Sequence, residues 1–466
     1  MANFIAVDLG ATSGRVAIGR VTTEKIELEI VHRFAHEIFE DKDGAILWDW
    51  KLITEQVIIG IEKCLVQGAP VSLAIDSWAV DYGLLDSKDN LISKVHSYRD
   101  PRTFPAFEEL VSRLGEERIY QDTGIQFLNF NTLYQLVSAK NDESYKAASK
   151  FLLIPDLLNA ELTGKISTEV TNASTTQLLD VKKRNWDYPL IELAGLRNEI
   201  FTELHEPGAE IGTIRGFGAL DGIKVVATAS HDTASAVAGI PFGDRDSEAY
   251  ISSGTWSLVG IESDVPVTSK QALAANLTNE LGAANTVRIL KNVTGMWLLE
   301  ECRRTWRASN EEWTIPQLVD EASRSLNFNS LIDPNDPRFR SPGEMPERIV
   351  AYCVEKGINP PRTKGEFTIC ILRSLAAAYQ KTISEIEEVT GKKISTIHIL
   401  GGGSQISLLN QLTASACGVK VKTGPVESTL FGNIAVQALS AGVVPSLLAA
   451  RALIGKSFIS EEFTPN

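Results

Sequence analysis

Short apolar runs alternate with stretches of helical periodicity along the chain. The apolar runs have the length and β-branched content of buried strands: FIAVDL (4–9), VSLAIDS (71–77), KVVATAS (224–230) and TIHIL (396–400). Between them, apolar residues recur at helical spacing, most clearly over 372–386, where Gly391 then offers a helix C-cap. This alternation predicts an α/β fold.

Two segments share one strand–turn–strand pattern. FIAVDLGATSGRVAIG (4–19) and AYISSGTWSLVGIE (249–262) each join two apolar strands through a tight turn of Gly and Ser/Thr. One such hairpin is common, but two that open the two halves of a chain indicate a duplicated domain with facing turns. Two unrelated hairpins remain the alternative.

The length of the chain also favours two domains. With 466 residues it exceeds a single comfortable hydrophobic core. The segment 240–247 is rich in Gly, Pro and charge. We therefore expect one domain over 1–243 and a second over 244–466.

The two turns suggest an anion-binding chemistry. Backbone N–H groups in a Gly/Ser/Thr turn form a nest for phosphate oxygens. Asp8 ends the first strand and is a candidate magnesium ligand, directly or through water. Arg15 either reaches phosphate oxygens or forms a salt bridge, and the glycines at 401–403 either admit a nucleoside or form a structural turn. The sequence contains neither GxxxxGK[ST] nor GxGxxG after a strand.

The motif SHDTASA (230–236) is a second candidate for chemistry. Asp232 is expected at the end of the strand over 224–232, flanked by His231 and Thr233. A carboxylate in that setting suits a general base, and phosphoryl transfer needs one to take the proton of the acceptor hydroxyl. The alternative is that Asp232 only caps a helix.

Charge and cysteine content narrow the function classes. The net charge is −14 and the pI about 5.1, which argues against nucleic-acid and anionic-membrane partners. The five cysteines contain no CxxC pair, so we do not expect a zinc site. We expect reduced thiols, and the sequence leaves open whether Cys353 and Cys370 form a disulfide.

No segment predicts a membrane span or a signal peptide. The first apolar run is short and ends at Asp8, and the apolar window 431–450 contains Asn433, Gln437 and Pro445. We expect a cytoplasmic protein in which that window forms a buried helix and turn.

The motifs together resemble the FGGY carbohydrate kinases of the actin-like ATPase superfamily, over essentially the whole chain. Generic members share the first hairpin, the His–Asp pair and the three glycines. More particular to the kinases of rhamnulose are GIQFLNFNTLYQL (124–136) and ASHDTASAV (229–237), and further blocks include SSGTWSL (252–258), LKNVTGMWLL (290–299) and GPVEST (424–429).

The resemblance implies a fold and a reaction. The fold would be two actin-like, ribonuclease H-like domains with mixed five-stranded sheets, flanking a central cleft that closes on sugar and ATP. The reaction would transfer the γ-phosphoryl group of Mg²⁺–ATP to the C1 hydroxyl of L-rhamnulose, by a monomer or homodimer with no nucleic-acid or membrane partner.

The resemblance also implies roles for individual residues. Asp232 would be the catalytic base and Asp8 the magnesium ligand. The sugar site would comprise Ala79, His231, Asp232, Thr233 and Asn292. The nucleotide site would comprise Ala11, Thr12, Ser13, Gly14, Arg15, Gly254, Thr255, Glu300 and Gly402.

Two positions depart from the family pattern. DSWAVD (76–81) has Ala79 where the family usually has glycine, and Glu300 stands where glutamine is usual. The methyl group of Ala79 narrows the sugar pocket or shifts specificity, and a negative Glu300 near ATP is unfavourable unless it faces away or is neutralised. The alternatives are a kinase of a related deoxyketose such as L-fuculose and a non-catalytic sugar-binding protein. An actin-like filament or chaperone ATPase is not expected to carry the blocks at 124–136 and 229–237.

Overall fold

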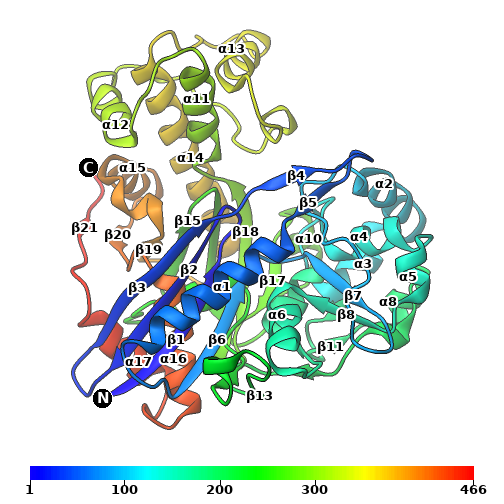
Figure 1. The fold of residues 1–466 in the computed structure, drawn as a ribbon. Coiled ribbons are helices and arrows are strands. Elements are labelled where there is room, and N and C mark those ends of the chain that lie inside the picture. Colours follow the sequence, from blue (N-terminus) through cyan, green and yellow to red (C-terminus); the bar gives the residue numbers. More distant parts are fainter. The chain divides into compact units, whose positions relative to one another are not determined.

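The computed structural model describes residues 1–466, which form two compact units (Figure 1). The first unit contains Met1–Pro241, Glu262–Ile289 and Glu427–Ile459, and the second contains Phe242–Ile261, Leu290–Val426 and Ser460–Asn466. Each unit therefore draws on both halves of the sequence, and the predicted linear boundary at 243/244 stays a prediction.

The first unit is built on a mixed six-stranded sheet in the order β13-β14-β6-β1-β2-β3. β1 pairs antiparallel with β2 and parallel with β6, so the hairpin predicted over 4–19 is confirmed. The strands are Ala2–Leu9 (β1), Ser13–Val21 (β2), Ile26–Ala35 (β3), Ser72–Ser77 (β6), Glu210–Thr213 (β13) and Lys224–Val226 (β14).

Helices cover both faces of this sheet, which explains why β1 is apolar at nearly every position. Ile5, Val7 and Leu9 belong to the hydrophobic cluster that contains α1 (Trp50–Leu65). Phe4 and Ala6 belong to the cluster that contains α9 (Asp232–Ala238), α16 (Ser428–Ser440) and α17 (Leu447–Gly455). Because side chains alternate along a strand, Asp8 shares the second face.

The second unit repeats the arrangement. β15 (Glu248–Ser253) pairs antiparallel with β16 (Trp256–Ser263) and parallel with β19 (Thr396–Leu400), in the order β18-β16-β15-β19-β20-β21. The other strands are β18 (Val287–Thr294), β20 (Lys420–Thr423) and β21 (Glu462–Phe463). The same hairpin-plus-parallel-strand pattern in both units supports the duplication. Both sheets exceed the five strands predicted, because short edge strands such as β13 and β21 extend them.

The remaining elements are mostly short. In the first unit they are β4 (Ile38–Glu40), β5 (Ile46–Trp48), β7 (Tyr82–Leu85), α2 (Thr103–Leu114), α3 (Glu116–Thr123), α4 (Thr132–Ala139), α5 (Glu143–Ala147), β8 (Lys150–Leu153), α6 (Ile154–Thr163), β9 (Thr168–Glu169), α7 (Val170–Ala173), β10 (Leu179–Asp180), β11 (Asn185–Trp186), α8 (Tyr188–Leu193), β12 (Leu204–His205), α10 (Lys270–Ala274) and β17 (Thr278–Leu281). In the second they are α11 (Trp297–Ala308), α12 (Ile315–Arg324), α13 (Met345–Glu355), α14 (Lys364–Thr390) and α15 (Ser407–Cys417). Single 3₁₀ turns lie at 174–176, 198–200, 218–220, 283–285, 337–339 and 402–405.

The strand predicted to end on Asp232 is wrong in its extent. β14 ends at Val226, and Asp232 is instead the first residue of α9, after His231 at the N-cap. The reason is that the backbone before the helix bonds to other partners: the amide of Ser230 donates to Glu169 Oε2 over 3.0 Å. The alternative that Asp232 lies at the start of a helix is therefore correct for its position. This position does not decide whether Asp232 is also a general base.

Two other expectations from the sequence are settled by the fold. All five cysteines are free thiols, so Cys353 and Cys370 do not pair. The apolar window 431–450 lies in α16 and α17 with the turn between them, and no helix in the chain combines the length and apolarity that crossing a bilayer requires.

Candidate functional site

The first turn lies between β1 and β2 and displays the predicted phosphate-binding residues. The amide of Gly10 donates to the carbonyl of Ser13 over 3.1 Å, which closes the turn and leaves Thr12 exposed. A Cβ atom on Gly14 would lie 2.2 Å from the ring of Phe34 on β3. Glycine is therefore required at position 14 for the hairpin to pack flat against its neighbour.

Three carboxyl groups gather beside this turn. Asp8 on β1 and Asp76 on β6 are paired in the register of two parallel strands. Arg15 Nη1 donates to Asp8 Oδ2 over 2.8 Å, and Asn433 Nδ2 donates to Asp76 Oδ2 over 2.6 Å. The charge of Asp232, at the start of α9, acts on both carboxyl groups.

Burial dominates the electrostatics of this carboxylate cluster, Asp8, Asp76 and Asp232. It raises the pKa of Asp8 to about 6, against the attraction of Arg15 and with repulsion from Asp232. Burial and repulsion from Asp8 raise the pKa of Asp76 well above its usual range. Oδ1 of Asp76 is buried without a hydrogen-bond partner. Such a cluster favours either protons or a cation.

The basic partner of the cluster is itself held in place. Arg15 Nε lies 3.4 Å from Glu427 Oε2, whose other oxygen accepts from Arg33 Nη2 over 2.9 Å. The sequence left two roles open for Arg15, and the structure shows the salt bridge.

His231 joins Asp232 to a buried ion pair. Its Nε2 lies 3.4 Å from Asp232 Oδ1, and its Nδ1 lies 3.0 Å from Arg288 Nη2 and 3.3 Å from Glu280 Oε2. Arg288 has no exposed surface and also contacts Glu280 over 3.0 Å. The guanidinium of Arg288 only donates and the carboxylate of Glu280 only accepts, so the two groups favour opposite tautomers at Nδ1 of His231.

The second turn, in the second unit, is tied to the start of α11. The amides of Gly295 and Met296 donate to the carbonyls of Thr255 and Gly254 over 3.1 and 2.9 Å. A Cβ atom on Gly295 would lie 2.7 Å from the carbonyl oxygen of Gly254. The block LKNVTG thus supplies a glycine against which the turn packs.

The three glycines after β19 have different surroundings. Gly401 has a φ of 73°, and Cβ atoms on Gly401 and Gly403 would lie 2.9 Å and 2.0 Å from the carbonyl oxygen and Oγ of Ser253. No atom lies within 4 Å of a Cβ built on Gly402. Gly401 and Gly403 are therefore required for packing, and Gly402 alone faces open space.

Two further predicted positions, Asn292 and Glu300, lie in the second unit. Asn292 is half-buried on β18. Glu300, in the first turn of α11, pairs with Arg303 and keeps a side chain that is 47% exposed. Its charge is therefore neutralised, which was one of the two conditions for tolerating it near a nucleotide.

Comparison with known proteins then identifies the family. Residues 3–239 match the model of the N-terminal domain of the FGGY family of carbohydrate kinases, and residues 249–441 match that of its C-terminal domain. The chain belongs to the FGGY family of carbohydrate kinases. As a member, it uses ATP as phosphoryl donor and a sugar as acceptor.

Relatives of this FGGY kinase cover nearly all of it. A rhamnulokinase of Bacillus subtilis strain 168 is 42% identical over 467 residues, spanning 99% of this chain and 95% of the relative. A rhamnulokinase of Bacteroides thetaiotaomicron is 40% identical, with coverage of 99% and 96%.

Solved structures of other kinases share the fold. A ligand-bound xylulose kinase of Lactobacillus acidophilus has a TM-score of 0.82 at 20% identity, covering 100% of this chain and 94% of its own. Glycerol kinase of Plasmodium falciparum with ADP has a TM-score of 0.79 at 16% identity, with the same coverage. The predicted family and fold class are confirmed.

Sequence reasoning missed three residues of this FGGY kinase's site. Asp76 was visible as an acid at the end of a strand, and its equivalence to Asp8 in that position was the available signal. Glu280 ends the block LAANLTNE (273–280), which carries part of the family resemblance but was given no role, and Arg288 belongs to no recognised motif. Only the fold brings the two residues to His231.

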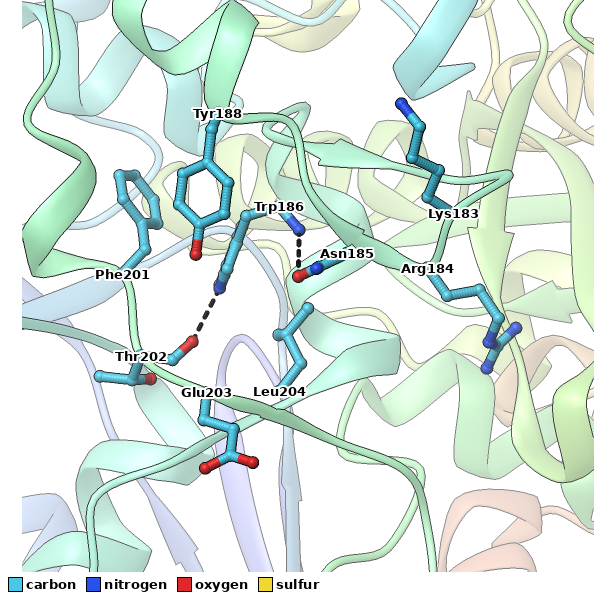
Figure 2. Close-up of a pocket in the computed structure, with 9 residues that line it drawn as sticks. All are labelled: Lys183, Arg184, Asn185, Trp186, Tyr188, Phe201, Thr202, Glu203 and Leu204. Carbon is cyan, nitrogen blue, oxygen red and sulfur yellow. Dashed lines mark hydrogen bonds between the residues drawn. The ribbon is translucent and has the colours of Figure 1, made fainter.

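A surface cavity of about 570 Å³ lies elsewhere in the first unit, and no predicted site residue lines it (Figure 2). Its cations are already engaged: Lys183 pairs with Asp180 at 2.6 Å and Arg184 with Glu206 at 2.7 Å. Trp186 Nε1 donates to the carbonyl of Thr202 over 2.8 Å. The two cations that line this cavity therefore both have acidic partners.

Proposed function

We propose that this protein phosphorylates L-rhamnulose at its C1 hydroxyl with ATP, giving L-rhamnulose 1-phosphate and ADP. The observation that carries the proposal is the carboxylate cluster at the first turn, within a chain 40–42% identical over nearly its full length to kinases named for that sugar. A buried anionic cluster beside a phosphate-binding turn suits phosphoryl transfer, which requires positioning and charge neutralisation.

In this mechanism Asp232 takes the proton from the C1 hydroxyl as the sugar oxygen attacks the γ-phosphorus. Thr233 Oγ1 donates to Asp232 Oδ1 over 3.0 Å, and His231 Nε2 lies 3.4 Å from the same oxygen. These contacts hold the Asp232 carboxyl group in one orientation. The role of the general base requires such positioning.

The other sugar and nucleotide contacts follow the family pattern. Ala79, His231, Thr233 and Asn292 would contact the sugar. Backbone amides of Ala11–Arg15 and of Gly254 and Thr255 would hold phosphate oxygens, and Gly402 would face the nucleoside because it faces open space. Glu300 would lie near the nucleotide with its charge balanced by Arg303.

Magnesium fits the carboxylate cluster. Asp76 Oδ1 lacks a partner, and Asp8 bears a raised pKa, so a cation would stabilise the ionised pair. No group of three or more acidic, His or Cys side chains is arranged to enclose a metal. Asp8 would therefore hold the ion with water and phosphate oxygens completing its shell, as Mg²⁺ prefers. When bound, the ion would neutralise charge on the phosphoryl oxygens.

A second candidate is a kinase of a related deoxyketose such as L-fuculose. The observation that favours it is Ala79, which replaces the usual glycine and stays half-buried rather than enclosed. A methyl group at this position would border the sugar in the proposed site, although Ala79 also packs against the hydrophobic cluster that contains Trp78 and Val80. A change of substrate would leave the phosphoryl-transfer machinery intact.

The test is a coupled ADP-release assay on the purified protein with Mg²⁺–ATP. L-rhamnulose, L-fuculose, D-xylulose, D-fructose and no sugar are compared, with Asp232→Asn and Ala79→Gly alongside. We expect turnover with L-rhamnulose that falls at least about 100-fold in Asp232→Asn.

Three other outcomes would change the proposal. Turnover with L-fuculose that Ala79→Gly shifts toward L-rhamnulose would establish the second candidate. Turnover unaffected by Asp232→Asn would remove the base assignment. Sugar binding by calorimetry without turnover, from protein with a cooperative melting transition, would establish a non-catalytic binding protein.

A further inference from the structure

The segment after β6 contains a backbone conformation that side chains rarely adopt. Val80 has a φ of 69°, and the amide of Asp81 donates to the carbonyl of Ala79 over 3.0 Å. These two facts describe a γ-turn with positive φ at its centre, which is the rare and strained form. A β-branched residue is an outlier there, because both of its branches crowd the backbone.

Two side chains of α4 hold the carbonyl of Val80. Thr132 Oγ1 donates to it over 2.7 Å, and Gln135 Nε2 donates to it over 3.2 Å. Gln135 Nε2 also lies 3.0 Å from Asp81 Oδ1, so the same amide group ties two successive residues of the turn. Both side chains are buried, which removes water as a competitor for these bonds.

Asp81 secures the other end of the turn. Its Oδ2 accepts from the indoles of Trp48 and Trp78 over 2.7 and 3.0 Å, and from the amide of Tyr98 over 3.1 Å. With so many donors the carboxyl group is fixed, although burial raises its pKa to about 6. A strained conformation persists only where its surroundings over-determine it in this way.

Only one residue of the γ-turn is partly accessible. Trp78, Val80 and Asp81 are buried, whereas Ala79 is half-buried and so is the accessible part of the γ-turn. We propose that Thr132 and Gln135 are positioning residues for the sugar: they hold the strained turn Ala79–Asp81 and thereby fix the backbone of Ala79. This inference rests on the proposed function, in which Ala79 contacts the sugar.

The inference assigns a purpose to the block GIQFLNFNTLYQL (124–136). Thr132 and Gln135 belong to it, and their polar groups bond to the turn rather than facing open space. Their effect on substrate binding is then indirect, through the angle at which the turn presents Ala79.

The strain is tested first, without reference to activity. Val80→Gly and Val80→Ala both remove the buried isopropyl group, but only alanine keeps a Cβ at positive φ. At an ordinary backbone position glycine is the less stable of the two. We expect the reverse here, with Val80→Gly melting about 2 °C or more above Val80→Ala. A lower melting temperature for Val80→Gly would overturn the strained turn.

The positioning role is tested by kinetics with Thr132→Val, which keeps the shape and removes the hydroxyl. In the wild type we expect KM for L-rhamnulose to rise about tenfold, with KM for ATP within about twofold of its original value. In the Val80→Gly background the same change should raise the sugar KM about threefold or less, because glycine needs no such restraint. The Val80→Ala background should retain the full effect.

Ser138→Ala is the matched control, because its hydroxyl lies on the same helix and donates only to the carbonyl of Gln135 over 2.8 Å. It should leave both KM values unchanged. An equal effect of Thr132→Val in all three backgrounds, or a parallel change in the ATP KM, would overturn the positioning role. Absence of turnover with any ketose would refute the proposed function instead, while the two melting temperatures would still report on the turn.

Discussion

Burial of the Asp8 carboxylate lowers the free energy of unfolding of the apoprotein. Burial raises the pKa of Asp8 to about 6 from its ordinary value of 3.8, because the cost of desolvation outweighs the attraction of Arg15. The ionised form is therefore disfavoured in the folded state. A difference of about 2.2 pKa units corresponds to about 3 kcal/mol of lost stability once both states are ionised. We predict that Asp8→Asn stabilises the apoprotein near neutral pH while abolishing most phosphoryl transfer.

The pH dependence gives the sharper form of this prediction. An acid with a raised folded pKa binds more protons in the folded state than in the unfolded state between the two pKa values. The destabilising contribution of Asp8 therefore shrinks as pH falls from about 6 toward about 4. The penalty at Asp8 should be about 3 kcal/mol at about pH 7.5 and about 1 kcal/mol at about pH 4.5. Asp8→Asn has no titrating carboxyl group at this position and therefore lacks this part of the pH dependence of stability.

The assay is urea unfolding of both proteins at these two pH values, without nucleotide. The difference in unfolding free energy between the wild type and Asp8→Asn should shrink by about 2 kcal/mol on acidification. This change does not depend on any pH-independent effect of the asparagine side chain. The exposed Asp43→Asn serves as a matched control and should show no such change. A difference that is constant with pH, or that grows on acidification, would refute the reasoning about burial. Saturating Mg²⁺–ATP should stabilise the wild type more than the variant, because ligands stabilise the state that binds them.

Three further predictions follow from single contacts. Gly295→Ala places a Cβ atom 2.7 Å from the carbonyl of Gly254, and we expect KM for ATP to rise about tenfold or more in the steady-state assay. Arg288→Met removes the guanidinium from the buried Glu280 and leaves His231 as its only basic neighbour, so it should destabilise by about 3 kcal/mol, measured by denaturant unfolding. Adding Glu280→Gln should recover most of that loss, and a double variant no more stable than the single one would contradict the pairing. Burial lowers the pKa of His36 to about 4 from 6.5, so the folded state binds fewer protons between these values and the contribution of His36 to stability falls as pH falls. His36→Phe should remove this contribution, which costs the wild type about 2 kcal/mol of unfolding free energy between about pH 6.5 and 4.5.

Local patterns predicted the elements closest to the chemistry. The two hairpins are visible because apolar strands of period-two geometry flank turns of small and hydroxyl residues, and both form as predicted. The predicted end of the strand before Asp232 was wrong. The apolar run continues past Val226, but the amide of Ser230 bonds to Glu169, and only an isolated bridge between Ser77 and His231 joins this segment to β6. A tertiary partner of this kind leaves no mark in local composition.

The candidate site likewise depends on tertiary contacts that the local sequence does not reveal. The residues within motifs were predicted because they are contiguous, as in the turn at 11–15. The residue pattern alone treated the glycines at 401–403 as one group, and only the family resemblance singled out Gly402. In the structure Gly401 and Gly403 pack against Ser253 and Gly402 does not. That distinction depends on which neighbour each Cβ would meet. Spacing along the chain does not reveal it.

The sequence by itself determined the class of this protein: alternating strands and helices, two phosphate-type turns, an acid before a small-residue helix, and through these its family. Only the tertiary structure decided how the acids act on one another. Asp8 and Asp76 meet because β1 and β6, more than sixty residues apart, pair in parallel register. Their pKa values, and the strain at Val80, arise from burial and from hydrogen bonds to distant elements. These are properties of packing, because the dielectric environment and the bonding partners of a side chain exist only once the chain has folded.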